Sequence, residues 1–514
     1  MVSKTASKDG DSHVPDSSNV FIYHAEAVWR HRDNYGPPGF KGVFMSPYVA
    51  LCAAFAAIGG KIFGYDQGVV SIGLVMPQFL ARFPQVSESS SSAGFDKDLL
   101  TAMIELGALI GALNQGWVAD KISRKYCVIV AVAVFSVGSA LQTGPTGYAM
   151  LVVARLIGGI GIGMLSMVAP LYISEISPPE IRGALLVLEE LSIVTGIVIA
   201  YWITYGTRYM AGEWAWRLPF LLQLIPGFVL GAGMLFLPFS PRWLVSKGRD
   251  GEALEALRRL RRLPSTDPRV QLEWYDIRAE VAFHKESSAL RHADLQDGST
   301  ISRIRLELAS WTDCFERGCW RRTHIGIAIM FFQQFVGISL GRRPLLLWGS
   351  FFMTISHFII AILVGKFSND WPHHRAAGWV SVAFLLFYML SFGSSWGPVP
   401  WAMPSKIFPS SLRAKGVALS TCSNWLNNFI IGLITPPLVQ NTGFGAYTFF
   451  AVFCLLSLLW TFYFVPETRG RTLEAMDHVF NDTNSEEEGA RRKAIEDQLI
   501  GNHPPAADQA LATN

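Results

Sequence analysis

The stretch AMLVVARLIGGIGIGMLSMVAPLYI, residues 149–173, contains a single charged side chain, Arg155. About 20 consecutive apolar residues are enough for a helix to cross the hydrocarbon core of a bilayer. Its glycines between residues 158 and 163 lie inside this apolar stretch with no strand before them. We therefore interpret them as positions where neighbouring helices approach closely, and not as a dinucleotide-binding loop.

The composition of the whole chain agrees with lipid as its solvent. Of the 514 residues 50% are hydrophobic and only 16% are charged, and the mean hydropathy is +0.30. A soluble domain of this length needs more charge to cover its surface. The net charge of +3 argues against a nucleic-acid partner. We expect a lipid bilayer to surround the chain.

Ten stretches are long and apolar enough to cross a bilayer as helices. They lie near residues 48–74, 99–118, 126–142, 149–173, 184–206, 218–238, 344–365, 377–404, 416–436 and 446–466. Lys and Arg cluster in the loops that follow the second, fourth and sixth spans. The positive-inside tendency then places these loops and both tails in the cytoplasm.

Three loop signatures occur twice in the same order. DKISRK at 120–125 is repeated as LGRRP at 340–344, EISPPEIRG at 175–183 as KIFPSSLR at 406–413, and FSPR at 239–242 as PETR at 466–469. Such repeated halves are typical of transporters whose substrate site lies between the two repeats.

The second repeat is shorter than the first. About 72 residues separate the start of the first span from Asp120, whereas about 19 separate Thr323 from Arg342 at the corresponding place. The difference of roughly 50 residues amounts to about one and a half membrane-crossing helices. We therefore expect a segment to be missing between Ile338 and Ser339, through a deletion or a wrongly predicted splice junction.

The apolar stretch before this junction, Ile325–Ile338, has only about 14 residues and is too short to cross fully. If it crossed, every later basic loop would lie outside the cell, against the positive-inside tendency. We expect it to be a buried or re-entrant stub, which leaves ten full crossings.

Motifs throughout the chain resemble those of the sugar porter family of the major facilitator superfamily, in its fungal form. They are GYDQG at 64–68, GWVADKISRK at 116–125, PLYISE at 170–175 with Arg182-Gly183, PRW at 241–243, FQQFVGI at 332–338, GPVPW at 397–401, SNW at 423–425 and PETRG at 466–470. The resemblance covers about residues 45–475 apart from the gap. It implies an all-α integral membrane protein with the two-bundle fold of this superfamily, its N-terminal six-helix bundle complete and its C-terminal bundle truncated.

On this basis the chain divides into five parts. They are an N-terminal tail (1–46), the six-helix bundle (47–240), a cytoplasmic linker with short helices (241–322), the incomplete second bundle (323–466) and a C-terminal tail (467–514). Three residues depart from the family pattern. Ser123 replaces a usual Gly, and Phe239 and Lys406 each replace a usual Glu, so we expect a weaker cytoplasmic ion-pair network.

Asp66 and Arg155 are candidates for proton coupling. An unpaired charge in an apolar span costs about 3 kcal/mol, so Asp66 needs a cation or a proton. Arg155 lies similarly deep in its span, and the resemblance implies that this acid and this arginine form the proton switch of the symporters. A static structural ion pair is the alternative interpretation.

The resemblance also implies a sugar site. Its candidates are Glu190, Gln333, Gln334, Trp401, Asn424 and Asn428. Amides supply the donor and acceptor pairs that sugar hydroxyls need, and Trp401 offers an apolar face for the ring. Gln333 and Gln334 could instead only join helices, and Trp425 is as well suited to packing as to a position at the membrane surface. We expect Glu189 to contact lipid headgroups or a loop.

A cytoplasmic gate is expected from the paired loop motifs. Its candidates are Asp120, Arg124, Glu175, Arg182, Arg242, Arg342, Arg343, Arg413, Glu467 and Arg469. No pattern for a metal site, a cofactor or an enzymatic nucleophile is present in the sequence.

The function that the resemblance implies is proton-coupled transport of a hexose or a related polyol across the plasma membrane, by a monomer, with alternating access. Because the missing segment would form a wall of the central cavity, we expect weak or absent transport from this chain. A facilitative uniporter and a non-transporting sugar sensor are the alternatives. Only about 45 residues follow Pro466, whereas sensors of this type have long cytoplasmic tails.

Overall fold

The computed structural model describes residues 35–37, 39–87, 93–295, 299–316, 319–335, 342–396, 403–408 and 412–466, with a few positions between 490 and 498. Within these ranges all regular structure is helical. Ten of the described helical segments are long and apolar enough to cross a membrane, which agrees with the number predicted. The Ile338–Ser339 junction lies outside the described residues.

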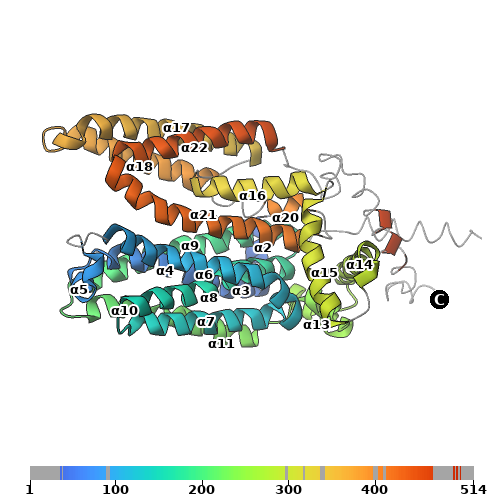
Figure 1. The fold of residues 1–514 in the computed structure, drawn as a ribbon. Coiled ribbons are helices and arrows are strands. Elements are labelled where there is room, and N and C mark those ends of the chain that lie inside the picture. Colours follow the sequence, from blue (N-terminus) through green and yellow to red (C-terminus); the bar gives the residue numbers. More distant parts are fainter. Residues whose placement is uncertain are drawn as a thin grey trace, which may run out of the picture.

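The first half of the chain forms one bundle, blue to green in Figure 1. Its helices are α2 (Phe40–Met45), α3 (Pro47–Ala56), α4 (Ile58–Gly73), α5 (Pro77–Arg82), α6 (Ala93–Ile122), α7 (Arg124–Thr143), α8 (Tyr148–Ile176), α9 (Pro179–Thr207), α10 (Trp214–Leu222) and α11 (Leu224–Phe236). α3 with α4, and α10 with α11, each make one interrupted span.

Glycines allow the helices of this bundle to pack closely. A β-carbon on Gly64 of α4 would overlap the Ile193 carbonyl of α9, and one on Gly163 of α8 would overlap the Ala108 carbonyl of α6. A β-carbon on Gly161, on another face of α8, would lie only 2.6 Å from the Phe135 nitrogen of α7. The predicted packing role of the glycines between 158 and 163 is therefore confirmed.

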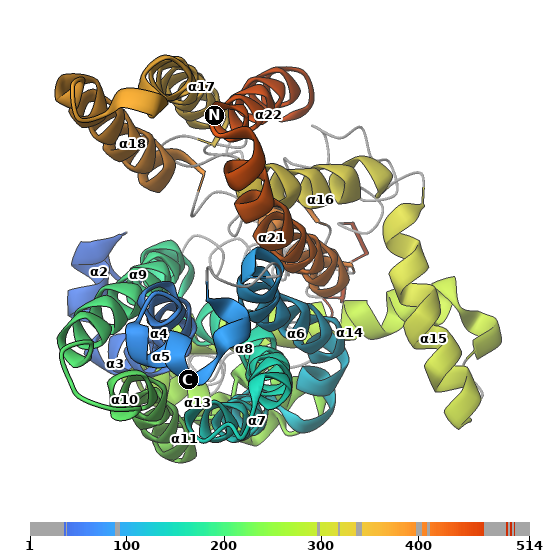
Figure 2. The ribbon, with the colours of Figure 1, turned by 60° about the vertical axis from the view of Figure 1, so that its left-hand side comes forward.

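The second half is more open. Its helices are α16 (Trp320–Phe335), α17 (Arg342–Phe367), α18 (Arg375–Ser395), α20 (Pro404–Ile407), α21 (Arg413–Thr442) and α22 (Phe444–Phe464). α21 packs against α6 and joins the two halves, as Figures 1 and 2 both show. α16 packs on α21 and α22, and at 16 residues it is not among the candidate spans.

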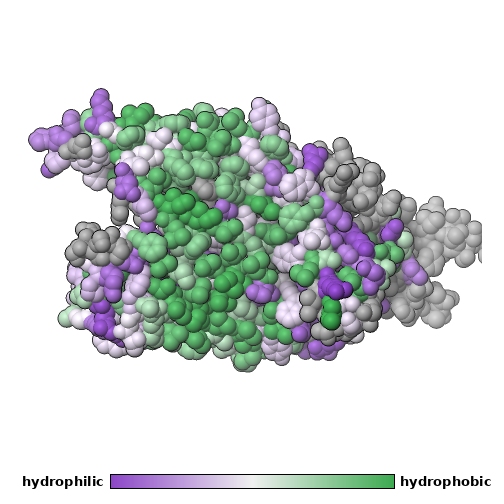
Figure 3. All heavy atoms as spheres, viewed as in Figure 1, coloured by the Kyte–Doolittle hydropathy of each residue, from purple (hydrophilic) through white to green (hydrophobic). Residues whose placement is uncertain are grey.

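α18 has few neighbours inside the protein. It begins at Arg375 and ends at Ser395, short of the predicted end at 404, and residues 397–402 lie outside the described part. Among the described elements α17 is its main contact, and only 6% of its most apolar window is buried. Apolar side chains form a broad band across the molecule between polar ends, as expected for a protein in a bilayer (Figure 3).

The linker between the halves consists of α12 (Pro241–Ser246), α13 (Asp250–Arg261), α14 (Pro268–Arg291) and α15 (Thr300–Thr312). Arg261 donates to the Ile176 carbonyl at the end of α8 across 2.8 Å and pairs with Glu273. The Tyr35 hydroxyl also donates to Glu273, at 2.8 Å. Burial, and next Glu273, raise the pKa of Tyr35 above its usual range. The start of the described chain is thus fixed to the linker and to the first bundle.

Candidate transport site and cytoplasmic gate

Asp66 and Arg155 meet in the centre of the first bundle. Arg155 Nη1 lies 2.8 Å from Asp66 Oδ2, and the two side chains are 2% and 0% exposed. Arg155 Nε also donates to the Leu100 carbonyl of α6 across 3.0 Å. The pair therefore links α4, α6 and α8. Each charge compensates the other where neither could be hydrated.

A second acid lies beside this pair and was missed in the sequence. Gln67 Nε2 donates to Glu105 Oε1 of α6 across 3.2 Å. The other Glu105 oxygen is buried and has no hydrogen-bond partner among the described residues. Glu105 interrupts the predicted span 99–118, so the rule that drew attention to Asp66, an acid inside an apolar span, would also have identified it.

Three of the predicted sugar-site residues form a chain of amides between α16 and α21. Asn424 Nδ2 donates to Gln333 Oε1 across 2.8 Å, and Asn428 Nδ2 donates to Asn424 Oδ1 across 3.3 Å. Gln333 and Asn424 are buried, and Asn428 is half-buried. An amide both donates and accepts hydrogen bonds, so a chain of amides is suited to bind sugar hydroxyls.

Of the other predicted sugar-site residues, the structure describes only the Glu190 side chain. Glu190 is half-buried on α9, and no hydrogen bond from it to a predicted site residue is found within the described part. The Gln334 side chain and all of Trp401 lie outside it. The expectation for Glu189 is wrong, because this side chain is 7% exposed and packs against Gly60 of α4. The close approach of α4 and α9 encloses it.

Trp425 is a packing residue between the two halves. Its Nε1 donates to Ser166 of α8 across 3.2 Å, and its ring meets Phe63 of α4 edge-on at 5.2 Å. The side chain is only 1% exposed. Of the two roles considered, the structure favours packing over a place at the membrane surface.

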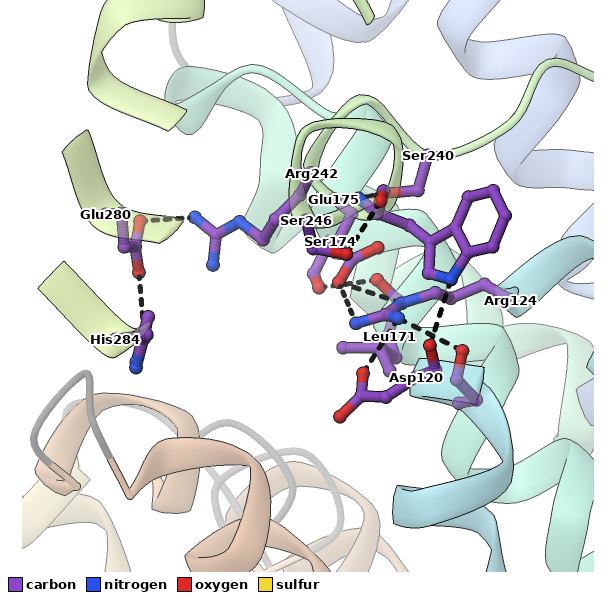
Figure 4. Close-up of polar contacts among 12 residues, drawn as sticks. Asp120, Arg124, Leu171, Ser174, Glu175, Ser240, Arg242, Ser246, Glu280 and His284 are labelled. Carbon is purple, nitrogen blue, oxygen red and sulfur yellow. Dashed lines mark hydrogen bonds and ion pairs between the residues drawn. The ribbon is translucent and has the colours of Figure 1, made fainter. Parts of the chain in front are cut away.

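The ends of the first-bundle helices next to the linker carry an ion cluster, shown in Figure 4. Arg124 lies between two acids, 2.9 Å from Asp120 Oδ1 and 3.0 Å from Glu175 Oε1, so it ties α6 and α7 to α8. Arg242 points away from this cluster and pairs with Glu280 of α14 at 2.7 Å. The motif arginine after the sixth span thus connects two helices of the linker, α12 and α14.

Of the remaining predicted gate residues, the structure describes only the Arg182 side chain. Arg182 donates to the Ser177 carbonyl across 3.3 Å, and no carboxylate pairs with it among the described residues. The side chains of Arg342, Arg343 and Arg413 and all of Glu467 and Arg469 lie outside the described part.

Two departures from the family pattern have visible consequences. Ser123 adopts φ 95°, a region that favours glycine, while its hydroxyl accepts from the Tyr126 amide at the start of α7. Phe239 stacks on Trp243 with ring centres 5.6 Å apart. The Lys125 ammonium lies 4.9 Å from the centre of the Phe239 ring. A cation–aromatic cluster therefore occupies the place where the family pattern has an acid.

Within the described ranges no group of three His, Cys, Asp or Glu side chains could hold a metal ion. The chemistry that the described groups offer is proton exchange at buried acids and hydrogen bonding by amides.

Comparison with known proteins identifies the family. The family model described as "Sugar (and other) transporter" matches residues 52–340 and 339–480. The "MFS glucose transporter mfs1" of Aspergillus flavus is 31% identical over 84% of this chain and 89% of its own. The "High glucose sensor RGT2" of Saccharomyces cerevisiae is 30% identical over 84% of this chain and 60% of its own.

Among solved structures, the proton:xylose symporter XylE of E. coli bound to 6-bromo-6-deoxy-D-glucose superposes with a TM-score of 0.67. It is 24% identical, over 85% of this chain and 99% of its own. This likeness shows the fold of the major facilitator superfamily. The matches to the family model and to the relatives go further, and on them the chain belongs to the sugar transporter family of that superfamily.

Proposed function

We propose that this chain is built for proton-coupled uptake of a hexose or a related polyol across the plasma membrane by alternating access. The observation that carries the proposal is the buried contact between Asp66 and Arg155. Protonation of Asp66 removes the charge that holds Arg155, so proton binding can change how α4 and α8 interact. A symporter needs such a link between protonation and helix packing.

The sugar would bind between the two halves, on the amides of Gln333, Asn424 and Asn428. Glu190, Gln334 and Trp401 are proposed to complete this site. Support comes from the position of α21, which contributes two of the amides and also packs against α6. A movement that follows sugar binding at α21 would therefore reach the helix that also contacts Arg155.

The cytoplasmic cluster around Arg124 is proposed to act as a gate. Opening towards the cytoplasm separates helix ends that such ion pairs hold together, so the pairs favour the closed cytoplasmic side. The salt bridge between Lys415 of α21 and Glu307 of α15 extends the network to the linker. The candidates Arg342, Arg343, Arg413, Glu467 and Arg469 remain part of this proposal. Both tails are proposed to lie in the cytoplasm and the chain to act as a monomer.

The same proposal includes a missing segment between Ile338 and Ser339. The family model matches in two pieces that meet at residues 339–340, where the repeat comparison places the gap. The low burial of α18 is what the loss of a neighbouring helix would produce. We expect weak or absent uptake from the chain as it stands.

Uptake of labelled hexose in a hexose-transporter-null yeast strain tests these statements. The chain is compared with a variant that receives, at the junction, the corresponding segment of the Aspergillus flavus relative. We expect background uptake from the first and clear uptake from the second, with equal amounts of both in the plasma membrane. Uptake by the unaltered chain would overturn the expected inactivity. If neither protein took up hexose although both were folded, the proposed transport would be contradicted.

A further inference from the structure

Asp66, Glu105 and Arg155 form a buried cluster in the first bundle. The proposed mechanism gives a role to Asp66 and Arg155 but none to Glu105. Glu105 lies on α6 in a membrane-spanning helix, and Gln67 connects it to α4 directly beside Asp66. Arg155, the partner of Asp66, contacts the same helix one and a half turns earlier, at the Leu100 carbonyl. Three helices thus bring two acids and one guanidinium into one buried site.

The charges of this site do not balance when both acids are ionised. Arg155 neutralises one carboxylate, and the salt bridge shows that this is Asp66. Among the other charged side chains on the packed helices, Lys97 and Asp98 of α6, Arg124 and Lys125 of α7, Glu175 of α8 and Lys415 of α21 lie near helix ends. Glu189 and Glu190 of α9, which packs on α4, are acids and add no positive charge. Lys61 of α4 has no ion pair with Glu105 among the described residues. One proton on the pair of acids makes the site neutral.

Two oxygens are free to carry that proton. Asp66 Oδ1 and Glu105 Oε2 are both buried without a hydrogen-bond partner among the described residues, whereas Asp66 Oδ2 and Glu105 Oε1 accept from Arg155 and Gln67. A charged oxygen left alone in such a place is costly, and a protonated one is not. Because Asp66 pairs with the Arg155 guanidinium in this structure, the proton belongs on Glu105.

We propose that Glu105 is a second proton-binding residue, and that it and Asp66 share one proton and one cation in alternation. In the first state Asp66 is ionised against Arg155 and Glu105 is protonated. When a proton from outside forms an O–H bond on Asp66, Arg155 becomes free to neutralise Glu105. The O–H bond of Glu105 then breaks, and its proton leaves towards the inside. One proton enters and one leaves, and the site is neutral in both states.

This inference rests on the proposed proton coupling, but it can be tested without transport. The full chain is purified in lipid, and infrared difference spectra are recorded between each variant and the unaltered chain at neutral pH. The carbonyl stretch of a protonated carboxylic acid is separate from that of a carboxylate. Glu105→Gln keeps an acceptor for Gln67, so it removes the acid with little change of packing.

We expect Glu105→Gln to remove the signal of one protonated carboxyl group per chain. The decisive variant is Asp66→Asn, in which Arg155 has lost its partner and should pair with Glu105. The Glu105 carbonyl signal should then vanish although Glu105 itself is unchanged. Arg155→Met should have the opposite effect and add the signal of a protonated Asp66. Glu213→Gln, at an exposed ion pair with Arg217, is the matched control and should leave the protonated-acid signal unchanged.

A protonated-acid signal that Glu105→Gln does not alter would overturn the proposal. It would also be overturned if that signal persisted in Asp66→Asn, because Glu105 would then be protonated independently of Arg155. Circular dichroism of each variant verifies helix content. Absence of sugar uptake in any of these proteins would affect the proposed function but not this result.

Discussion

Arg155 donates a 2.8 Å hydrogen bond from Nη1 to Asp66 Oδ2, and both side chains are buried. The contact joins α8 to α4, whose Gly59 lies against Ala169 and Leu165 of α8. Removal of one partner of a buried pair leaves an uncompensated charge, which costs about 3–5 kcal/mol. The free energy of folding should therefore depend on this pair, as transport is also proposed to do.

A double-mutant cycle measures this coupling. In the Glu105→Gln background, where Arg155 has no second acid to pair with, we expect Asp66→Asn and Arg155→Met each to destabilise the purified chain. The variant with both substitutions should be more stable than the sum of the two effects predicts, by about 3 kcal/mol. Thermal unfolding followed by tryptophan fluorescence provides the comparison. Additive single effects would mean that the two charges do not compensate each other.

Ser123 offers a test of backbone strain. A non-glycine residue in its conformation costs about 1–3 kcal/mol, while its hydroxyl caps α7. Ser123→Gly should relieve the strain and raise the thermal stability by about 1 kcal/mol. Ser123→Ala keeps the strain and loses the cap, so it should lower the stability by about 1 kcal/mol. Equal effects of the two substitutions would contradict this explanation.

The contacts around the glycines predict that a substitution by alanine has very different effects on folding at two positions. At Gly64 a β-carbon would overlap the Ile193 carbonyl, whereas at Gly116 of α6 nothing lies within 4 Å of it. Gly64→Ala should therefore abolish correct folding, seen as loss of the monodisperse peak in fluorescence-detected size exclusion. Gly116→Ala is the matched control and should behave as the unaltered chain. A tolerated Gly64→Ala would show that α4 and α9 are not packed as described.

Tyr35 fixes the start of the described chain to the linker. Its hydroxyl donates towards Glu273 and the Arg269 carbonyl, and its ring lies under Arg261. Tyr35→Phe removes the hydrogen bonds and keeps the ring, so limited proteolysis should cleave the N-terminal segment several-fold faster. Tyr463→Phe, at a side chain that is 75% exposed, is the control and should not change the rate. An unchanged rate for Tyr35→Phe would show that these bonds do not hold the tail.

Much of this architecture could be predicted from the order of apolar spans and loop motifs. The packing glycines of α8 follow from the need of membrane helices to approach closely. Span number and the intramembrane charges follow from the rule that lipid tolerates neither open backbone nor unpaired charge. The same rule applies to Glu105, which was overlooked because it lies in an otherwise ordinary apolar span. The prediction failed at Glu189, because the face of α9 that is buried depends on the glycines of a different helix.

The side of the first bundle next to the linker was less predictable. Loss of the usual acid at position 239 predicted only a weaker ion network, yet the Phe239 ring gathers Lys125 and Trp243 around it. Arg242 in turn pairs with Glu280, a residue of the linker outside the repeated motifs. Such substitutions are compensated by three-dimensional neighbours that no spacing along the chain reveals.

Proton movement that accompanies sugar uptake tests the central claim most directly. Hexose is added to an unbuffered suspension of transporter-null yeast expressing the chain with its segment restored at Ile338–Ser339, and the external pH is recorded together with uptake. We predict alkalinisation of the medium in step with uptake, and its loss in the Asp66→Asn variant. Hexose uptake without alkalinisation, equal in the Asp66→Asn variant, would contradict proton coupling and indicate a facilitative uniporter.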